Sequence, residues 1–237
     1  MENSTKPITI LCSTYNSERW IDGYLDSINT QLLKNFDIIF VDAKSTDSSL
    51  QKIKDFSFRE GIDKTVISCD NKIPIYEAWN MAIEKATTPY VINVNTDDRI
   101  FPAALVTYLY YAQTLPDGDV FYGAYQVVDE PSHSHKVAVK FAVPHNHQHL
   151  LQDCYCGPFP FLKRQTIVDA GLFNPDFTIS GDYEMWLRLS KQGKNFYNIN
   201  ELIGSYYENP EGMSTNRESS HWQEHLNQDR ILRTTYA

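Results

Sequence analysis

The first part of the chain alternates short apolar runs with segments of helical periodicity, and this alternation restricts the fold more than any other feature. Apolar runs at residues 8–13, 36–41, 65–68 and 89–95 have the length and unbroken hydrophobicity of strands that are buried on both faces. Between these runs apolar residues recur at helical spacing, as in Ile75, Ala78 and Ala82. This order predicts an α/β fold with a mostly parallel central sheet and helices on both faces.

The second part of the chain is less regular. Helices are expected after Pro102 and over residues 163–170, 182–191 and 216–233. A strand is expected at 120–122, and residues 126–128 and 137–141 are expected to pair as a ribbon around a polar tip. Without an internal repeat or a low-complexity linker, residues 1–237 are predicted to form a single domain, with a regular half over about 7–123 and a less regular half over about 124–237.

Composition and charge exclude several classes of protein. The 237 residues are 42% hydrophobic and 22% charged, as in ordinary soluble globular proteins. A formal net charge of −9 argues against nucleic-acid binding, but it permits a phosphate ligand whose charge a metal ion offsets. The start of the chain lacks the apolar core of a signal peptide, and no apolar run reaches the length of a membrane span. With four cysteines interpreted as reduced thiols, we expect a cytoplasmic protein, and peripheral membrane contact stays open.

Two adjacent carboxylates, Asp97 and Asp98, follow the fourth apolar run directly. Neighbouring carboxylates repel each other and favour a cation, and the carboxyl ends of strands in α/β sheets are where such folds bind ligands. Oxygen ligands of this kind suit Mg²⁺ or Mn²⁺, which is typically held by one or two carboxylates together with substrate phosphates. The alternative is a favourable negative charge at the start of the helix near Pro102.

Two further acids and a histidine cluster are candidates for chemistry. Asp42 ends the second apolar run, where it could accept hydrogen bonds from a ribose or base, although a turn or capping role is the more common use. Asp182 starts a helix and shares its face with core-type residues, so it is either an N-cap or a partly desolvated general base. His145, His147 and His149 would share one side of an extended segment, but a polar loop is favoured over a metal site because no acid or cysteine completes the set.

Several enzyme signatures do not occur in the sequence. It contains no G-x-G-x-x-G fingerprint, no G-x-x-x-x-G-K-[ST] loop and no G-x-S-x-G nucleophile elbow. Dinucleotide-dependent oxidoreductases, P-loop enzymes and α/β-hydrolases are therefore disfavoured.

Five segments, in order, resemble family 2 glycosyltransferases with the GT-A fold. Residues 8–16 read ITILCSTYN, 38–47 read IIFVDAKSTD and 75–80 read IYEAWN. Residues 95–98 read NTDD, a form of the DXD motif, and 181–189 read GDYEMWLRL. The resemblance covers roughly residues 7–189. It implies an inverting transfer of a sugar from a nucleotide-sugar to an acceptor hydroxyl, as in polysaccharide biosynthesis.

The resemblance also implies roles for particular residues. Residues 7–123 would form the nucleotide-sugar half and residues 124–237 the acceptor half. Asp98 would bind Mn²⁺ or Mg²⁺ at the diphosphate, and Asp182 would deprotonate a glycan or lipid-linked acceptor. The implied donor-binding residues are Ser13, Tyr15, Asp42, Asn80 and Asp97.

The chain departs from the family pattern at positions that concern the donor. Ala43 stands where the family often has an aspartate that reads uracil, so UDP-, dTDP- and GDP-sugars all stay open. Lys72 replaces the usual aspartate of the segment before residue 75, and it either adds a cation near the donor or is a solvated loop residue. The loop over residues 209–214 lacks the basic residue sometimes found before its glycine.

Two alternatives compete with a transferase. A sugar-1-phosphate nucleotidylyltransferase shares much of the topology, but it would carry a glycine-rich basic loop after the first strand, and residues 13–17 are not such a loop. A non-catalytic module that only holds a nucleotide-sugar is the other alternative. Retention of both Asp98 and Asp182 argues against it, and Ala43 keeps it open.

Overall fold

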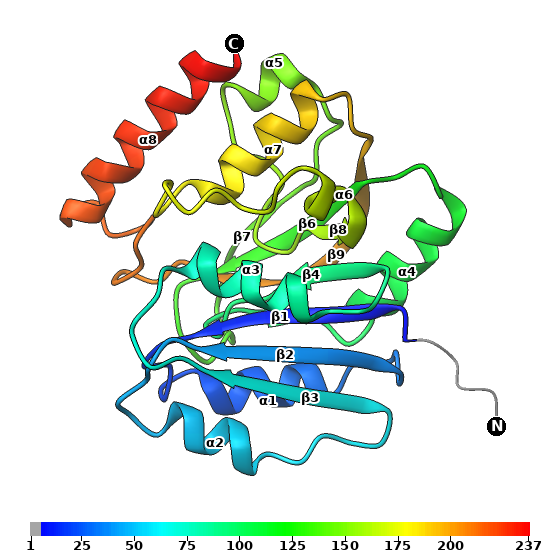
Figure 1. Ribbon diagram of the computed structural model, residues 1–237, viewed down its shortest axis with the longest axis vertical. Coiled ribbons are helices and arrows are strands. Elements are labelled where there is room, and N and C mark those ends of the chain that lie inside the picture. The colour runs from blue at the N-terminus through cyan, green and yellow to red at the C-terminus, as the bar shows by residue number, and fades with distance from the viewer. Residues whose placement is uncertain (1–5) are drawn as a thin grey trace.

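The computed structural model describes residues 6–237, which form a nine-stranded mixed sheet covered by helices (Figure 1). The order of the strands is β3-β2-β1-β4-β8-β6-β9-β5, and β7 pairs with β6 beside this path. The strands are β1 (Ile8–Thr14), β2 (Phe36–Asp42), β3 (Ile62–Ser68), β4 (Tyr90–Asn93), β5 (Arg99–Ile100), β6 (Val120–Val128), β7 (Lys136–Lys140), β8 (Phe161–Lys163) and β9 (Phe196–Tyr207). The helices are α1 (Ile21–Asn29), α2 (Ser49–Asp55), α3 (Ile75–Lys85), α4 (Ala104–Thr114), α5 (His147–Leu150), α6 (Arg164–Asp169), α7 (Gly181–Lys191) and α8 (Ser220–Tyr236).

The first four long strands pair in parallel, as the alternation of strand and helix predicts. β1 lies between β2 and β4, with Thr14 opposite Asp42 and Leu11 opposite Asn93. β3 extends this part of the sheet beyond β2. The carboxyl ends of β1, β2 and β4 therefore meet at one edge, and the polar residues that follow these strands gather there.

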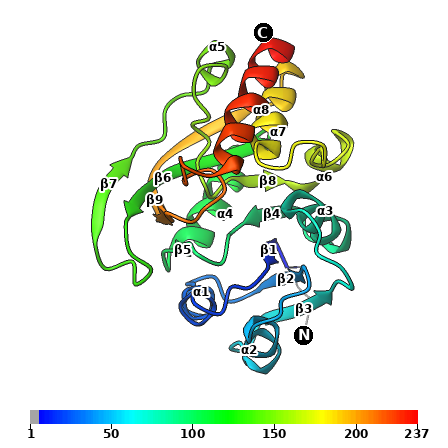
Figure 2. The ribbon, with the colours of Figure 1, turned by 90° about the vertical axis from the view of Figure 1, so that its left-hand side faces the viewer.

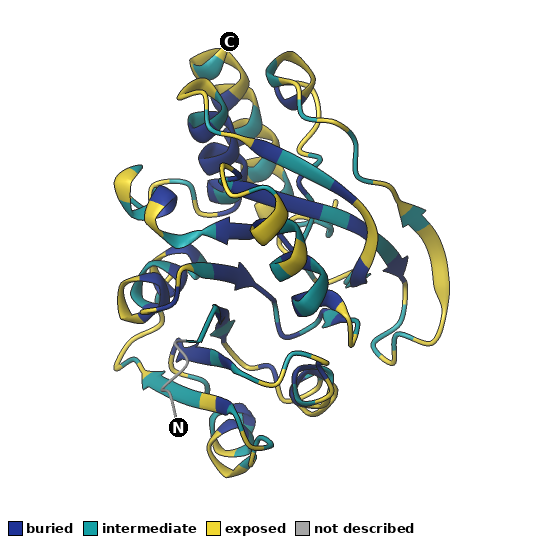
Figure 3. Ribbon diagram, turned by 90° about the vertical axis from the view of Figure 1, so that its right-hand side faces the viewer, coloured by how far each residue is buried: buried dark blue, intermediate teal, exposed yellow. Residues whose placement is uncertain are grey.

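The remaining strands make the sheet mixed. β8 is antiparallel to both β4 and β6, whereas β9 runs parallel to β6 along most of its length. The predicted ribbon is confirmed, because β6 and β7 pair as an antiparallel hairpin. β7 is the most exposed strand of the sheet, and it lies at the periphery of the molecule in Figure 3.

Two hydrophobic cores cover the two faces of the sheet. On one face, side chains of β1, β2 and β4 such as Leu11, Val41 and Val91 pack against α3 and α7. On the other face, alternate residues such as Ile10 and Ile92 pack against α1 and α4. Figure 2 shows α3 and α1 on opposite sides of the parallel strands. Since successive strand residues point to opposite faces, strands buried on both faces need the unbroken apolar runs seen in the sequence.

Some boundaries differ from those that the sequence predicts. The helical spacing of apolar residues after the first apolar run extends to Leu32 in the sequence, but α1 ends at Asn29 and Leu32 is 60% exposed. Residues 45–47 read Ser-Thr-Asp, which could cap a helix, but α2 begins only at Ser49, and Asp47 Oδ1 accepts the Ser49 N–H at 3.0 Å. The strands β5, β8 and β9 and the short helix α5 were not predicted at all.

The predicted absence of a membrane-spanning segment agrees with the described part of the chain. None of the helices in residues 6–237 is long and apolar enough to cross a bilayer. The four cysteines are all unpaired.

Candidate active site

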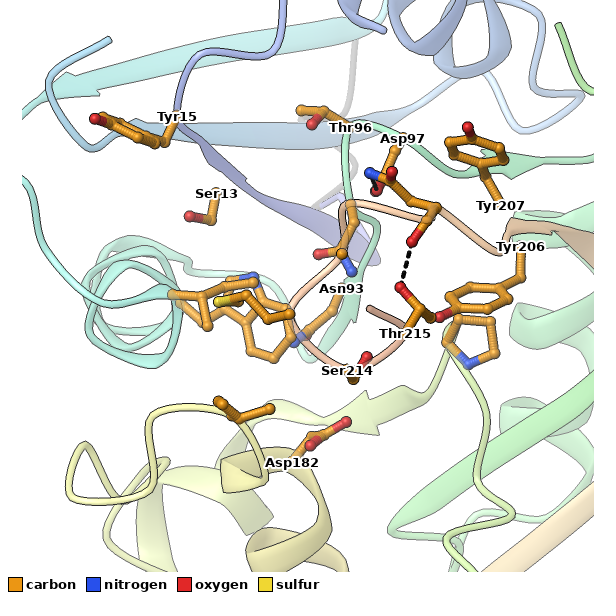
Figure 4. A pocket seen from close by; sticks show the side chains of 18 of the residues that line it. Ser13, Tyr15, Asn93, Thr96, Asp97, Asp182, Tyr206, Tyr207, Ser214 and Thr215 are labelled. Carbon is orange, nitrogen blue, oxygen red and sulfur yellow. Dashed lines mark hydrogen bonds between the residues drawn. The ribbon is translucent and has the colours of Figure 1, made fainter. Parts of the chain in front are cut away.

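A cavity of about 1080 Å³ opens at the carboxyl ends of the parallel strands (Figure 4). Parts of the chain that are distant in sequence line it, among them the ends of β1 and β4, the segment before α3, residues from 154–160, the start of α7 and residues from 206–215. Because these parts are distant in sequence, the cavity exists only when the parallel and mixed regions of the sheet pack together. Its position at the strand ends is where open α/β sheets bind ligands.

Ser13 and Tyr15, both predicted to bind the donor, line the cavity where β1 ends. Tyr15 is 41% exposed, and the Lys72 Nζ lies 4.1 Å from the centroid of its ring. Lys72 also lines the cavity, so the structure favours the cationic alternative for this residue over a solvated loop residue. Ala43 is a further lining residue, and its methyl group leaves this part of the wall without a polar side chain.

Asp42 lies behind this wall rather than on it. The side chain is buried, and Oδ2 accepts the Ser45 N–H at 3.0 Å. This bond stabilises the turn after β2, in which Lys44 adopts a left-handed φ of 65°. The other oxygen, Oδ1, is buried without a partner. Asp42 thus supports the loop that carries Ala43 and is not among the residues that line the cavity.

Asn80 is also outside the cavity lining, although the family resemblance implies donor binding. Its Nδ2 donates to the Phe173 carbonyl oxygen at 2.8 Å, and its Oδ1 accepts the Phe173 N–H at 2.9 Å. Both ends of the amide are therefore used on the backbone of one distant residue. Asn80 fixes the loop before α7 against α3, which is a structural contact.

The strand-end acids Asp97 and Asp98 have different environments. Asp97 lines the cavity, and its Oδ2 lies 3.5 Å from the Asn209 Nδ2. Asp98 is buried beneath it, where Oδ1 accepts the Tyr207 N–H at 3.0 Å and Oδ2 has no partner. Of the two acids, only Asp97 lines the cavity.

Burial raises the pKa of both strand-end acids, that of Asp98 well above its usual value, and the Asp97 charge adds to the shift at Asp98. The Arg99 guanidinium opposes both shifts. The guanidinium of Arg99 donates its hydrogen bonds to backbone carbonyl oxygens, among them those of Thr96 and Asp98 at 2.9 and 2.7 Å. Its charge therefore offsets the acids only in part, and a cation at Asp98 would offset more.

Asp182 lines the cavity at the first turn of α7, and Figure 4 shows it across the cavity from Asp97. Its Oδ1 accepts hydrogen bonds from the Tyr183 N–H at 2.9 Å and the Tyr76 hydroxyl at 3.0 Å. Tyr76 packs so tightly on this turn that a Cβ at Gly181 would lie 2.7 Å from its ring. The glycine before Asp182 is what lets the Tyr76 side chain of α3 reach the carboxylate.

Tyr76 connects this carboxylate to an aromatic cluster. The rings of Tyr76 and Trp79 are 5.3 Å apart, and Phe173 contacts Trp79 and Trp186 at 5.4 and 6.3 Å between centroids. Burial in this setting raises the pKa of Asp182, and the hydrogen bonds from Tyr183 and Tyr76 limit the rise. A carboxyl group with a raised pKa has the basicity that a general base needs near neutral pH.

The C-terminal helix α8 holds the loop that leads into Asp182. The buried Gln228 accepts the N–H groups of Ile179 and Ser180 with its Oε1, at 3.1 and 3.0 Å. The Ser180 hydroxyl in turn donates to the Asp229 Oδ1 at 2.7 Å. These contacts make the position of the Asp182 turn depend on α8.

The histidine cluster has a structural role. The Ser190 hydroxyl lies 3.0 Å from the His145 Nε2 and 2.8 Å from the His147 Nδ1, and the His149 ring packs 4.9 Å from that of Tyr155. Within residues 6–237, no three histidine, cysteine or acidic side chains are grouped in a way that could hold a metal ion. The segment is not the polar loop that the sequence favours, because His147 and His149 lie in the short helix α5, whose first turn is capped by the Asn146 side chain.

Sequence reasoning missed the aromatic and amide residues of the wall. Trp79, Asn93 and Trp186 line the cavity, as do Tyr206 and Tyr207 at the end of β9. Trp79 and Trp186 belong to the segments that resemble the family, yet their helical spacing indicates only core positions. Asn93 could have been identified from the sequence, because it is an amide inside an otherwise apolar strand.

A family model described as "Glycosyl transferase family 2" matches residues 9–167. The chain belongs to this family. Among curated relatives, the teichoic acid poly(glycerol phosphate) polymerase of Staphylococcus epidermidis is 35% identical over 104 residues, which are 43% of this chain and 14% of the polymerase. The amylovoran biosynthesis glycosyltransferase AmsB of Erwinia amylovora is 26% identical over 210 residues, which are 84% of this chain and 69% of AmsB.

Solved structures show the fold of this family 2 member. TarS 1-349 of S. aureus in complex with UDP-GlcNAc aligns with a TM-score of 0.74 at 18% identity, over 87% of this chain and 59% of the TarS chain. The mannosyltransferase PcManGT of Pyrobaculum calidifontis, in complex with GDP-Man and Mn²⁺, aligns with a TM-score of 0.65 at 18% identity, over 94% and 65% of the two chains. The expected GT-A fold is therefore confirmed.

Proposed function

We propose that this chain is an inverting glycosyltransferase, which moves a sugar from a nucleotide-diphosphate sugar to a hydroxyl of a glycan or lipid-linked acceptor. The observation that carries the proposal is that Asp97 and Asp182, from distant parts of the sequence, line one cavity. Membership of family 2 supports sugar transfer in general. The two acids supply what the reaction needs at its two ends, a polar anchor at the donor and a base at the acceptor.

Asp182 is the base in this proposal. Its carboxylate takes the proton of the acceptor hydroxyl as that oxygen bonds to the anomeric carbon, and the bond from this carbon to the diphosphate oxygen breaks. The raised pKa of Asp182 supports the role, because a base works best when its pKa is near the working pH. A single attack from the face opposite the leaving group inverts the anomeric carbon and needs no covalent intermediate.

A divalent metal ion, Mn²⁺ or Mg²⁺, completes the donor site. Asp98 would hold it and Asp97 would contact the donor. Asp98 itself does not line the cavity, but its Oδ2 is buried without a partner and its neighbour Asp97 lies on the wall, so the pair of acids fits such an ion. When bound, the ion neutralises charge that develops on the departing diphosphate. One or two carboxylates suffice for Mg²⁺ when phosphates supply further ligands, so the lack of a three-residue cluster in the described chain is compatible with this site.

The nucleotide is a UDP-, dTDP- or GDP-derivative. TarS and PcManGT were solved with UDP-GlcNAc and GDP-Man respectively, which supports a nucleotide-sugar without selecting the base. Residues 1–237 act as one domain in this proposal, with residues 7–123 holding the donor and 124–237 the acceptor, in the cytoplasm and with peripheral contact to a membrane where the acceptor is lipid-linked.

The test combines nucleotide binding with one variant. We expect at least one of UDP, dTDP and GDP, with Mn²⁺, to raise the melting temperature, and a screen of nucleotide-sugars for metal-dependent hydrolysis to identify the donor. Asp182→Asn should lower transfer about 10²–10⁴-fold while nucleotide affinity stays within about twofold.

Each outcome has a distinct meaning. If none of the three nucleotides changes the melting temperature, the donor site is refuted. Loss of nucleotide binding in Asp182→Asn would instead assign the residue a structural role. Full hydrolysis and transfer in that variant would exclude Asp182 as the base, and nucleotide-sugar binding without any turnover in the unaltered chain would favour the non-catalytic module.

A further inference from the structure

Polar atoms without a hydrogen-bond partner are concentrated on the cavity wall. Within residues 6–237, nine buried side-chain nitrogen and oxygen atoms have no partner. Five of these nine belong to residues that line the cavity: both amide atoms of Asn93, the Oδ1 of Asn95, and the indole nitrogens of Trp79 and Trp186. Of the four lining residues with such atoms, three are buried. These are Asn93, Trp79 and Trp186, with exposed fractions of 3, 6 and 1%.

Such atoms are costly unless water or a ligand pairs them. Most buried polar groups in native proteins are hydrogen-bonded, and an orphaned donor or acceptor costs about 1–3 kcal/mol. Asn93 is the extreme case, because neither its donor nor its acceptor is used. A leucine or valine at this position of β4 would continue the apolar run of the strand without that cost. The amide therefore has no use in the fold itself that the structure reveals.

The chemistry of these groups selects a class of ligand. The indole N–H groups of Trp79 and Trp186 only donate, and the Asn93 amide both donates and accepts. All three side chains are uncharged, and the acids Asp97 and Asp182 share the wall with them, so the set suits the hydroxyl and amide groups of a neutral sugar ring better than a further carboxylate. The lysine of the wall, Lys72, is held over the Tyr15 ring, and Figure 4 shows Tyr15 well apart from Asn93.

The position of the three residues agrees with a sugar. Asn93 ends β4, the strand that leads to Asp97, and Trp186 lies one helical turn after Asp182 on α7. In Figure 4 Asn93 lies between Asp97 and Asp182. In the proposed reaction the transferred sugar occupies this interval, between the diphosphate and the base.

We propose that Asn93, Trp79 and Trp186 form the subsite that binds the transferred sugar and that selects an uncharged, hydroxyl-bearing ring. This subsite rests on the proposed function, because it takes the sugar of the same donor. Its residues bind and orient the ring, and Asn93 is the specificity-determining residue.

Two variants test the subsite by removing hydrogen-bonding groups, Asn93→Leu at nearly unchanged volume and Trp186→Phe with loss of part of the buried ring. Asn93→Leu removes the whole amide, and Trp186→Phe removes the indole N–H. Trp222→Phe is the matched control, since Trp222 belongs to α8 and is not among the lining residues. Titration calorimetry with Mn²⁺ compares the nucleotide that binds in the test above with its glucose, galactose, mannose and N-acetylglucosamine esters and with its glucuronic acid ester.

We expect the unaltered protein to bind at least one neutral sugar ester more tightly than the nucleotide alone, and the glucuronic acid ester no more tightly. Asn93→Leu and Trp186→Phe should each weaken the best ester about tenfold or more, leaving the nucleotide within about twofold, and Trp222→Phe should change neither. The melting temperature of Asn93→Leu without ligand should equal or exceed that of the unaltered protein.

The results that overturn the subsite differ from those that overturn the function. Nucleotide binding with no gain from any neutral ester refutes the subsite alone. So does an unchanged ester affinity in both variants, or a lowered melting temperature in Asn93→Leu, which would make the amide structural. If no nucleotide binds at all, the proposed function fails and the subsite fails with it.

Discussion

The Tyr76 hydroxyl has a single hydrogen and two acceptors within reach. The Ile179 carbonyl oxygen is 2.5 Å away and the Asp182 Oδ1 is 3.0 Å away. The nearer acceptor competes for the proton, so the stabilisation of the Asp182 carboxylate by Tyr76 is partial. This competition leaves the carboxyl group with a pKa that is raised by burial and only moderated by the hydroxyl.

Replacing Tyr76 with Phe should move the pH dependence of transfer. The hydrogen bond lowers the pKa of Asp182, so its loss raises that pKa further. A base must be deprotonated to act, and the acidic limb of the kcat profile should therefore shift to higher pH. Tyr122→Phe is the control, since its hydroxyl bonds to the Val143 carbonyl oxygen. Coincident profiles for Tyr76→Phe and the unaltered protein would contradict the contact.

Rising pH favours the activity of Asp182 as a base, but it lowers the contribution of the same carboxyl group to folding stability. Its folded pKa lies above the value of about 4 in an unfolded chain, so the folded state binds more protons between these two values. The contribution of Asp182 to folding stability is thus present at low pH and is lost as pH rises through the raised folded pKa.

Asp98→Asn should separate stability from metal binding. The substitution keeps an oxygen for the Tyr207 N–H and removes a carboxyl group whose ionised form is disfavoured by burial. Without metal we expect a melting temperature equal to or above that of the unaltered protein, measured by calorimetry at neutral pH. The further rise with Mn²⁺ and nucleotide should disappear. Asp70→Asn, on the exposed surface, should keep that rise, and a full Mn²⁺ response in Asp98→Asn would contradict the assignment.

At the scale of elements, α8 lines the cavity only with His221, and it acts on the Asp182 turn through the buried Gln228. Gln228→Leu would leave the N–H groups of Ile179 and Ser180 without an acceptor, at a cost of about 2–4 kcal/mol in the free energy of unfolding. Because these residues lead into the Asp182 turn, we expect kcat to fall by tenfold or more while the KM for the donor changes little. Steady-state kinetics and denaturant unfolding measure the two effects.

Gln223→Leu is the matched control on the same helix. Gln223 is exposed, so its loss should leave both kcat and stability unchanged. A fall in stability of Gln228→Leu with an unaltered kcat would show that α8 supports the fold without positioning Asp182.

The parallel strands were predictable because each is buried on both faces, which forces an unbroken apolar run. β9 was not predicted because it is only partly buried and carries the polar residues Asn198, Asn200 and Glu201. Its register with β6 also shifts at Gly123. β8 has three residues, too few for a periodic pattern. Strands could thus be predicted where both of their faces are buried. They could not be predicted where only one face is buried or where the strand is very short.

The candidate site could be predicted only as far as strand ends and acids define it. Ser13, Tyr15, Asp97 and Asp182 line the cavity, as expected from their places in the sequence. The environment of Asn80 could not be predicted, because its partner Phe173 is brought close only by the packing of α3 against the loop before α7. Which of two adjacent acids faces the cavity likewise depends on the turn that follows β4.

For the whole molecule, the cavity takes its lining from both halves of the chain, so a ligand there should stabilise all of it. At a concentration of 100 Kd, a bound nucleotide contributes about 2.7 kcal/mol, which for a chain of this length corresponds to a rise of about 5–10 °C in melting temperature. We expect calorimetry to show one cooperative unfolding transition, whose midpoint rises when Mn²⁺ and nucleotide are added. Two transitions, of which one stays in place, would contradict the single-domain prediction.

The distribution of tryptophan in the molecule has a practical consequence. Of the four tryptophans in the chain, Trp20, Trp79 and Trp186 line the cavity, and Trp222 lies outside it. Indole emission responds to the polarity of its surroundings, so filling the cavity changes the surroundings of most of the fluorophores at once. The protein therefore contains its own optical reporter of occupancy, and unlabelled nucleotides, sugars and acceptors can be ranked by the quenching or blue shift they produce.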